Sequence, residues 1–264
     1  MIEITSKENQ SFKEILQLRR RKYRSKWNKF VIEGERSIDF MLRRQITPQS
    51  IWMSESYYHS SPSICETFSG PVYCVADALF AKLTDTESPQ GILAVCRHES
   101  LPQADLSRAQ QVLVLDRIQD PGNAGTLLRI ATAVNCQAVL TTVGTVDLLS
   151  PKVIRSSMGA ILQVPIRQGL DEEEIWQMAR AQDMPVIVTA LSDSTSYAEM
   201  PGFRSGLWVF GNEGNGVSDF WLAKADHRYF IPMENQMDSL NVAIAGAVFL
   251  FHNRYLTECS SCKN

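Results

Sequence analysis

The feature that most constrains the fold is an alternation of short apolar runs with helical patterns that begins near residue 111. Residues 112–118, VLVLDRI, form a nearly continuous apolar run, which is typical of a parallel strand buried on both faces. A helix is predicted directly after it, over 122–135, and the same succession repeats to the end of the chain. Strands that alternate with helices form a parallel sheet covered on both faces. The sequence therefore predicts an α/β domain over residues 111–264.

The remaining elements follow the same pattern. Further strands are predicted at 138–142, at the end of the segment 151–166, and at 185–191, 206–212 and 228–233; further helices are predicted at the start of 151–166, at 172–182 and after Asn241. A smaller α/β domain is predicted over residues 1–98. Its predicted helices span 11–25, 35–44 and 76–85, and its predicted strands span 30–34, 50–56, 71–76 and 91–98. The polar segment 99–110 is predicted to be a linker, and 264 residues are sufficient for two domains.

Charge is distributed unevenly along the chain. The net charge is −3, yet residues 1–44 hold twelve Lys or Arg and six Asp or Glu, a local balance of +6 that leaves −9 for the remainder. The run 19–29 interleaves Tyr23 and Trp27 with basic residues, which favours RNA because bases stack on aromatic rings while phosphates pair with cations. A solvated helix face is the alternative. The predicted RNA-binding residues are Arg19, Arg20, Arg21, Lys22, Arg24 and Lys26.

Several classes of protein are excluded by composition. No window approaches 18 uncharged apolar residues, so no membrane span is predicted, and the acidic N-terminus MIEITSKENQ lacks the apolar core of a signal peptide. We therefore expect a cytoplasmic protein. The six cysteines are scattered, which does not favour a disulfide framework. Cys259 and Cys262 form a CxxC without a second ligand pair, so no metal site is predicted.

Three predicted loops follow carboxyl ends of strands, where open parallel sheets collect their ligands. In the first, 119–129, a proline and two glycines shape a turn into a helix that Asn123 can cap. Arg129 follows less than two turns later, near the same end, although alone it would be taken for a surface arginine. In the second, 210–218, three glycines allow close approach of a ligand to the backbone. This spacing is neither the dinucleotide fingerprint nor a phosphate loop, and Glu213 is unusual among the glycines.

The third loop precedes the last helix and contains Ser239 and Asn241. Capping accounts for one of these two side chains but not for both. An unpaired buried Asn241 would cost about 1–3 kcal/mol. We therefore expect Asn241 to have a partner, in the protein or in a ligand.

Together, the motifs resemble those of the SpoU (TrmH-type) RNA methyltransferases of the SPOUT class. The resemblance rests on the segments DPGNAGTLLRIATA at 120–133, SPKVIRSSMGAILQVP at 150–165, VFGNEGNGVS at 209–218 and IPMENQMDSLNVAIAGAV at 231–248. The N-terminal segments ITSKEN, RRRKYR and FVIEG resemble the small ribosomal-protein-like substrate-binding domain found in many of these enzymes. The resemblance covers nearly the whole chain.

This resemblance implies a deep trefoil knot in the C-terminal domain, a homodimer, and binding of S-adenosyl-L-methionine (AdoMet). The implied cofactor-binding residues are Thr189, Ala190, Leu191, Gly211, Asn212, Gly216, Ile231, Met233 and Leu240. The implied reaction is methyl transfer to a ribose 2′-hydroxyl, most readily of rRNA. The implied catalytic residues are Asn123, Arg129, Glu213, Ser239 and Asn241.

The residues are compatible with this chemistry, since the sulfonium is already a reactive methyl donor and the protein must mainly position it and help remove a proton. None of the three loops contains His or Cys, and arginine is almost always protonated, so the exact role of Arg129 stays open. One departure is Asn235-Gln236, where the family usually has glycine. Asn235 is expected to tolerate a left-handed conformation.

Other functions remain possible from the sequence. A tRNA 2′-O-methyltransferase or an antibiotic-resistance methylase would have the same architecture. An RNA-binding ribosome-assembly factor without transfer activity is a second class, supported by Asn235-Gln236. A nucleotide-dependent oxidoreductase is a third, and the missing GxGxxG after residues 112–118 argues against it.

Overall fold

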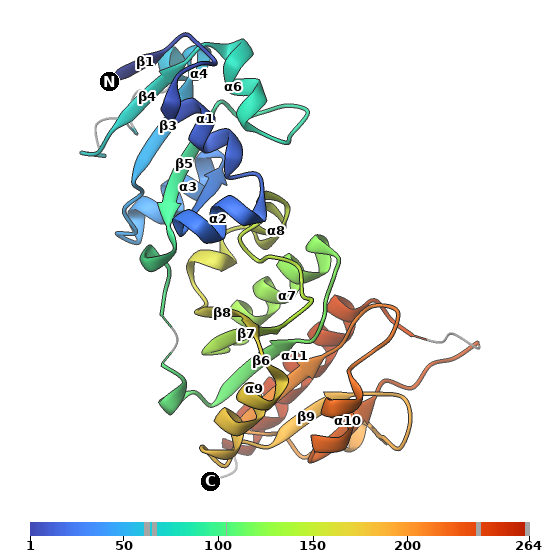
Figure 1. The fold of residues 1–264 in the computed structure, drawn as a ribbon. Helices are drawn as coiled ribbons and strands as arrows, with labels where there is room; N and C mark the ends of the chain where they lie inside the picture. Colours follow the sequence, from blue (N-terminus) through green and yellow to red (C-terminus); the bar gives the residue numbers. More distant parts are fainter. Residues whose placement is uncertain (61–63, 65–67, 104, 236–238, 262–264) are drawn as a thin grey trace. The chain divides into compact units, whose positions relative to one another are not determined.

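The computed structural model describes residues 1–60, 64, 68–103, 105–235 and 239–261. The chain divides into two compact units (Figure 1). The first contains Met1–Leu101 and Leu149–Leu162, and the second contains Pro102–Leu148 and Gln163–Asn264. The segment Leu149–Leu162, which lies within the predicted domain 111–264, groups with the first unit. The predicted domain bounds stay a prediction.

The first unit contains a five-stranded mixed sheet with the order β1-β4-β3-β5-β2. Its strands are β1 (Ile2–Ile4), β2 (Lys29–Glu33), β3 (Ser50–Ser54), β4 (Val72–Val75) and β5 (Ile92–Arg97). Its described α-helices include α1 (Gln10–Gln17), α2 (Arg21–Trp27), α3 (Glu35–Arg43), α4 (Glu55–Ser60), α6 (Asp77–Leu83) and α8 (Pro151–Ser157). Strand β5 runs antiparallel to both of its neighbours, β3 and β2. A core that includes Phe12, Trp52 and Phe80 lies between the sheet and its helices.

The single helix predicted over 11–25 is wrong. Helix α1 ends at Gln17 and α2 begins at Arg21, with Arg20 in an extended conformation between them. Arg24 explains the break, because its Nη1 donates to the carbonyl oxygens of Leu18 at 2.8 Å and Arg19 at 2.7 Å. This contact reaches back six and five residues along the chain. It supplies donors at the end of α1, where the last carbonyls of a helix lack partners.

The second unit contains a seven-stranded sheet with the order β10-β12-β9-β11-β6-β7-β8, in which all paired strands are parallel. Its strands are β6 (Gln111–Leu115), β7 (Ala138–Thr142), β8 (Ile166–Leu170), β9 (Val186–Thr189), β10 (Thr195–Ser196), β11 (Gly206–Phe210) and β12 (His227–Phe230). Its α-helices include α7 (Pro121–Ala133), α9 (Glu172–Arg180), α10 (Asp219–Lys224) and α11 (Val242–Ser261). The prediction of a parallel α/β domain preceded by a smaller α/β domain is confirmed.

Helices cover both faces of this sheet, as alternate residues of β11 show. Val209 packs in a core cluster with Ile175 of α9 and Trp221 of α10. Its neighbour Phe210 lies on the other face, near Gly246 of α11. Helix α11 also packs closely on α7, because a Cβ added to Gly246 would lie 2.6 Å from Leu127 Cδ2. The knot implied by the resemblance remains a prediction.

The strand order fixes where the site can form. Strands β12, β9, β11 and β6 are consecutive neighbours, and parallel strands end at the same edge of a sheet. The loops that leave these four strands must therefore lie side by side, although they are widely separated in the sequence. Among the described helices, none is long and apolar enough to cross a membrane.

Candidate cofactor and catalytic site

A cavity of about 590 Å³ lies at the carboxyl edge of the seven-stranded sheet. Its volume falls within the range of small-molecule sites, roughly 300–1,000 Å³. Its walls come from the loops after β9, β11 and β12 and from the first turns of α11. All nine residues predicted to bind the cofactor line this cavity: Thr189, Ala190, Leu191, Gly211, Asn212, Gly216, Ile231, Met233 and Leu240. Their role in binding remains a prediction.

The glycine-rich loop after β11 is a closed turn that could not form with a side chain at its first position. The backbones of Asn212 and Gly216 exchange two hydrogen bonds, both of 2.9 Å. Asn212 Oδ1 also accepts from the N–H groups of Gly214 at 3.0 Å and Asn215 at 3.1 Å. A Cβ on Gly211 would lie 2.1 Å from backbone atoms of Gly216 and Val217. The loop therefore requires glycine at position 211.

Glu213 ties this loop to the one that follows β6. Its carboxylate accepts hydrogen bonds from the backbone N–H of Gln119 at 3.2 Å and of Asp120 at 3.1 Å, and from Asn123 Nδ2 at 2.9 Å. Burial acts to raise the pKa of Glu213, but hydrogen bonds from the Asn123 side chain and from backbone groups outweigh it, so the pKa lies below its ordinary value. Glu213 is thus an ionised acceptor that holds the first loop in place.

Asn123 and Asn241 connect the first loop to the third. Asn241 Nδ2 donates to Asn123 Oδ1 at 2.8 Å, and Asn241 Oδ1 accepts from the N–H groups of Ala243 at 2.9 Å and Ile244 at 3.3 Å. The expectation that Asn241 has a partner is therefore confirmed, since it both caps α11 and binds another loop. The predicted capping role of Asn123 is wrong, because Asp120 caps α7 and accepts from the Asn123 N–H at 2.8 Å.

Two other predicted positions lie in the third loop. Ser239 lines the cavity beside Asn241 and is exposed. Asn235 has φ of 57°, so its expected left-handed conformation is confirmed. This is the conformation that a glycine would adopt without strain. Gln236, the other residue of the departure from the family pattern, lies outside the described residues.

Arg129 is not among the residues that line the cavity. Its side chain is exposed on α7, two turns after the loop that Glu213 holds. Among the described residues it makes no hydrogen bond or ion pair. A guanidinium that is free on the surface of a site-forming helix is available to a ligand.

The basic residues predicted to bind RNA divide into two groups in the first unit. Arg20, Arg21, Lys22 and Lys26 are exposed on or beside α2, and the rings of Tyr23 and Trp27 lie next to them with centroids 5.0 Å apart. Arg24 is a correction to the prediction. It is only 5% exposed and its guanidinium binds backbone carbonyls, so it is structural.

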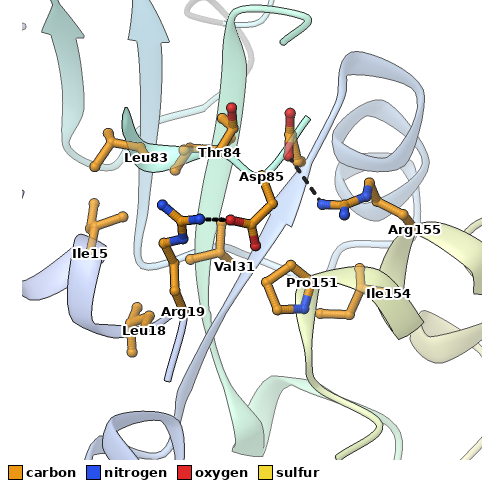
Figure 2. Close-up of a pocket in the computed structure, with 12 residues that line it drawn as sticks. Ile15, Leu18, Arg19, Val31, Leu83, Thr84, Asp85, Pro151, Ile154 and Arg155 are labelled. Atoms are coloured by element: carbon orange, nitrogen blue, oxygen red, sulfur yellow. Dashed lines mark hydrogen bonds and ion pairs between the residues drawn. The ribbon is translucent and has the colours of Figure 1, made fainter. Parts of the chain in front are cut away.

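Arg19 is also engaged within the first unit. It forms an ion pair with Asp85 and donates to the Lys82 carbonyl at 3.2 Å. Figure 2 shows this pair at a small cavity that Arg155 of α8 also lines. The cavity holds about 20 Å³, enough for one water molecule and too little for a ligand. Arg19 therefore has a structural partner, although its side chain is partly exposed.

Sequence reasoning missed Asp116 and Arg117, which follow β6. Asp116 is completely buried and Arg117 has φ of 56°. The available signal was two adjacent charged residues within the apolar run 112–118, but a strand end and a turn commonly carry such residues.

Comparison with known proteins defines the class to which this site belongs. Residues 110–251 match the SpoU rRNA Methylase family, and residues 9–94 match the MRM3-like substrate binding domain. The chain belongs to the SpoU rRNA methylase family, which confirms the resemblance inferred from the motifs.

Individual relatives extend over nearly the full chain. A protein of Bacillus subtilis named 23S rRNA (guanosine(2553)-2′-O)-methyltransferase RlmP is 35% identical over 96% of this chain and 100% of its own length. An uncharacterized tRNA/rRNA methyltransferase of Synechocystis, slr1673, is 31% identical over 95% and 93%. The crystal structure of an AdoMet-bound rRNA methyltransferase from Sinorhizobium meliloti superposes with a TM-score of 0.83 at 25% identity, covering 96% of this chain and 97% of that one.

Proposed function

We propose that this protein transfers the methyl group of AdoMet to a ribose 2′-hydroxyl of rRNA. The observation that carries the proposal is the cavity at the carboxyl edge of the sheet, which is joined to the first loop through Glu213 and Asn123. Membership of the SpoU family supports it, as does the name of the Bacillus subtilis relative as a 23S rRNA 2′-O-methyltransferase.

The residues of the cavity fit AdoMet. The tight turn at Gly211 and the open space beside Gly216 let a ligand approach the backbone, which suits the donors and acceptors of an adenosine. Apolar side chains such as Val217 and Phe249 also line the cavity. AdoMet would supply an activated methyl group on its sulfonium, so the chain itself must mainly bind and orient the two reactants.

The residues of the chain position the loops of the site and the RNA. Glu213, Asn123 and Asn241 hold the loops in register, and Ser239 presents a hydroxyl at the cavity wall. We propose that Arg129 positions the RNA ribose. Its exposed guanidinium can pair with the backbone phosphate next to the reacting hydroxyl. Because the pKa of Glu213 is lowered, this carboxylate stays ionised near neutral pH and does not donate a proton.

The exposed cations of α2 are proposed to bind the RNA backbone, with Tyr23 and Trp27 available to stack on bases. The match of residues 9–94 to a substrate binding domain supports this role. The predicted cytoplasmic location remains part of the proposal.

A homodimer is part of the proposal as well. Helix α11 exposes Ile244 (55%), Phe251 (47%) and Tyr255 (64%). Their spacing of seven and four residues places them on one face of the helix. Such a face is suited to bury itself against a second copy of the chain.

The test is transfer of labelled methyl from AdoMet to purified rRNA and tRNA that lack the modification, followed by alkaline hydrolysis. A 2′-O-methyl group blocks cleavage at the next phosphate, so we expect label in alkali-resistant dinucleotides from rRNA. Label in mononucleotides would mean base methylation and would contradict the proposal. Label in alkali-resistant dinucleotides from tRNA alone would show that the substrate is tRNA and not rRNA.

A ribosome-assembly factor without transfer activity is the second candidate. Its support was the replacement of glycine by Asn235-Gln236, but Asn235 adopts a left-handed conformation that glycine also provides. Binding of rRNA without binding of AdoMet would establish this alternative.

A further inference from the structure

Two residues outside the proposed mechanism hold both ends of the glycine-rich loop. Asp116 and Arg117 follow β6, which pairs with β11, the strand that leads into the loop. The carbonyl oxygen of Arg117 accepts a hydrogen bond from Asn212 Nδ2 at 2.9 Å, at the start of the loop. Asp116 Oδ2 accepts one from the backbone N–H of Ser218 at 2.8 Å, at its end.

The conformation of Arg117 is what directs its carbonyl. Its φ of 56° lies in the left-handed region, which is uncommon for residues other than glycine and persists where the surroundings require it. Thr142 of β7 fixes the pair from the other side, since its Oγ1 accepts from the Arg117 N–H at 3.0 Å and donates to Asp116 Oδ1 at 3.0 Å.

The burial of Asp116 argues for the same role. A completely buried carboxylate is costly unless it is paired and hydrogen-bonded. Three donors satisfy it: the Ser218 N–H, the Thr142 hydroxyl and Arg117 Nη2 at 3.2 Å. One of these donors belongs to the glycine-rich loop, so the loop is part of what makes the buried charge tolerable.

We propose that Asp116 and Arg117 are positioning residues that clamp the glycine-rich loop in the conformation that binds AdoMet. This inference rests on the proposed function. It predicts that the backbone of Arg117, and not only its guanidinium, determines cofactor affinity.

The decisive comparison is Arg117→Gly against Arg117→Val in the full-length protein. Both variants lose the guanidinium, but glycine accepts φ of 56° freely while a β-branched residue does not. We expect AdoMet to bind about tenfold more weakly to the valine variant than to the glycine variant. Amide hydrogen exchange over residues 211–218 should be correspondingly faster in the valine variant. Turnover at saturating AdoMet should be similar in the two.

Asp183 offers a matched control, because it has φ of 50° at an exposed turn after α9 and does not line the cavity. Asp183→Gly and Asp183→Val impose the same backbone contrast there. They should differ in melting temperature but bind AdoMet equally.

Asp116→Asn tests the other end of the clamp and should speed exchange of the Ser218 amide. Equal AdoMet affinity and equal loop exchange in the two Arg117 variants would overturn the proposal. Faster loop exchange in Arg117→Val, in a protein whose wild type does not bind AdoMet, would support the clamp and refute the cofactor assignment instead.

Discussion

Asn123 and Asn241 each form hydrogen bonds through both the nitrogen and the oxygen of the side-chain amide. Asn123 donates to Glu213 and accepts from Asn241, while Asn241 donates to Asn123 and accepts from the first turn of α11. Serine, threonine or aspartate could cap the helix equally well. A side-chain amide offers both a donor and an acceptor in one rigid planar group. Asparagine at both positions therefore serves the junction between the loops, and Asn241 also caps α11.

Arg129→Ala should abolish methyl transfer while changing AdoMet affinity by less than about threefold, well under 1 kcal/mol. The reason is that Arg129 is exposed and does not line the cavity. Calorimetry of AdoMet binding and a transfer assay would measure the two effects. Arg167→Ala, which removes an exposed arginine paired with Glu174, serves as the control. Retained turnover would remove Arg129 from the mechanism.

Glu213→Gln should reduce stability at neutral pH more than at acid pH. Because the pKa of Glu213 is lowered in the folded protein, the ionised carboxylate stabilises the fold above its unfolded pKa of about 4.3. That contribution is lost as pH falls through the folded pKa. Urea unfolding of both proteins at pH 7 and pH 3 measures it. A difference between them that is as large at pH 3 as at pH 7 would contradict this account.

Among the elements, the glycine-rich loop makes the strictest demand on sequence. Gly211→Ala should disrupt the loop, since its Cβ would meet backbone at 2.1 Å, and overpacking of this kind costs about 1–3 kcal/mol. Loss of AdoMet affinity by calorimetry and a lower melting temperature are expected. Gly214→Ala is the matched control, because the nearest atom to its Cβ is a side-chain oxygen at 3.7 Å. If both variants bind AdoMet like the wild type, the loop does not form the site.

Helix α2 should contribute to the salt dependence of RNA binding. Changing Arg20, Arg21 and Lys22 to glutamine should weaken binding and reduce the slope of log K against log salt by up to about two units. The same change at three exposed arginines of α3 and its end, Arg36, Arg43 and Arg44, controls for net charge. If the control variant reduces the slope by the same amount, α2 is a solvated helix face and not an RNA-binding one.

Several elements of the second unit could be predicted from the sequence, and others could not. Strand β7 has the predicted bounds, and β6, β11 and α11 lie close to theirs. The two-residue strand β10 and the six-residue helix α10 carry too few residues for a period to be recognised. The break between α1 and α2 was missed because the spacing of apolar residues does not reveal its cause, the hydrogen bonds from the Arg24 guanidinium to the carbonyls of Leu18 and Arg19.

The candidate site was predictable in part, for similar reasons. Glycine spacing and polar residues at strand ends marked the three loops, and the residues along the cavity came from the family resemblance. The particular bonds were not predictable, because Asn123 and Asn241 are 118 residues apart. Asp116 and Arg117 were missed because neither burial nor a left-handed φ can be inferred from two charged residues within a predicted strand.

For the whole molecule, the exposed face of α11 predicts a dimer. Phe251→Glu should yield a monomer in light scattering, because it places a charge in an apolar contact while the side chain is 47% exposed in the single chain. Methyl transfer should fall with dimerisation if the partner completes the site. Ile2→Glu, at a residue that is 48% exposed on β1, should leave the mass unchanged. A dimer that persists in Phe251→Glu would place the interface elsewhere.

The chain passes between its two units three times, after Leu101, Leu148 and Leu162. Helix α8 therefore belongs to the first unit, where Arg155 lies 3.6 Å from Glu33 of β2, although it is encoded between two strands of the other sheet. A domain attached by a single linker can be exchanged between genes by one recombination event. In this protein such an exchange at residues 99–110 would join a foreign β2 to the resident α8. A new RNA specificity acquired in this way must bring matching substitutions in Leu149–Leu162, so the two distant stretches are expected to evolve together.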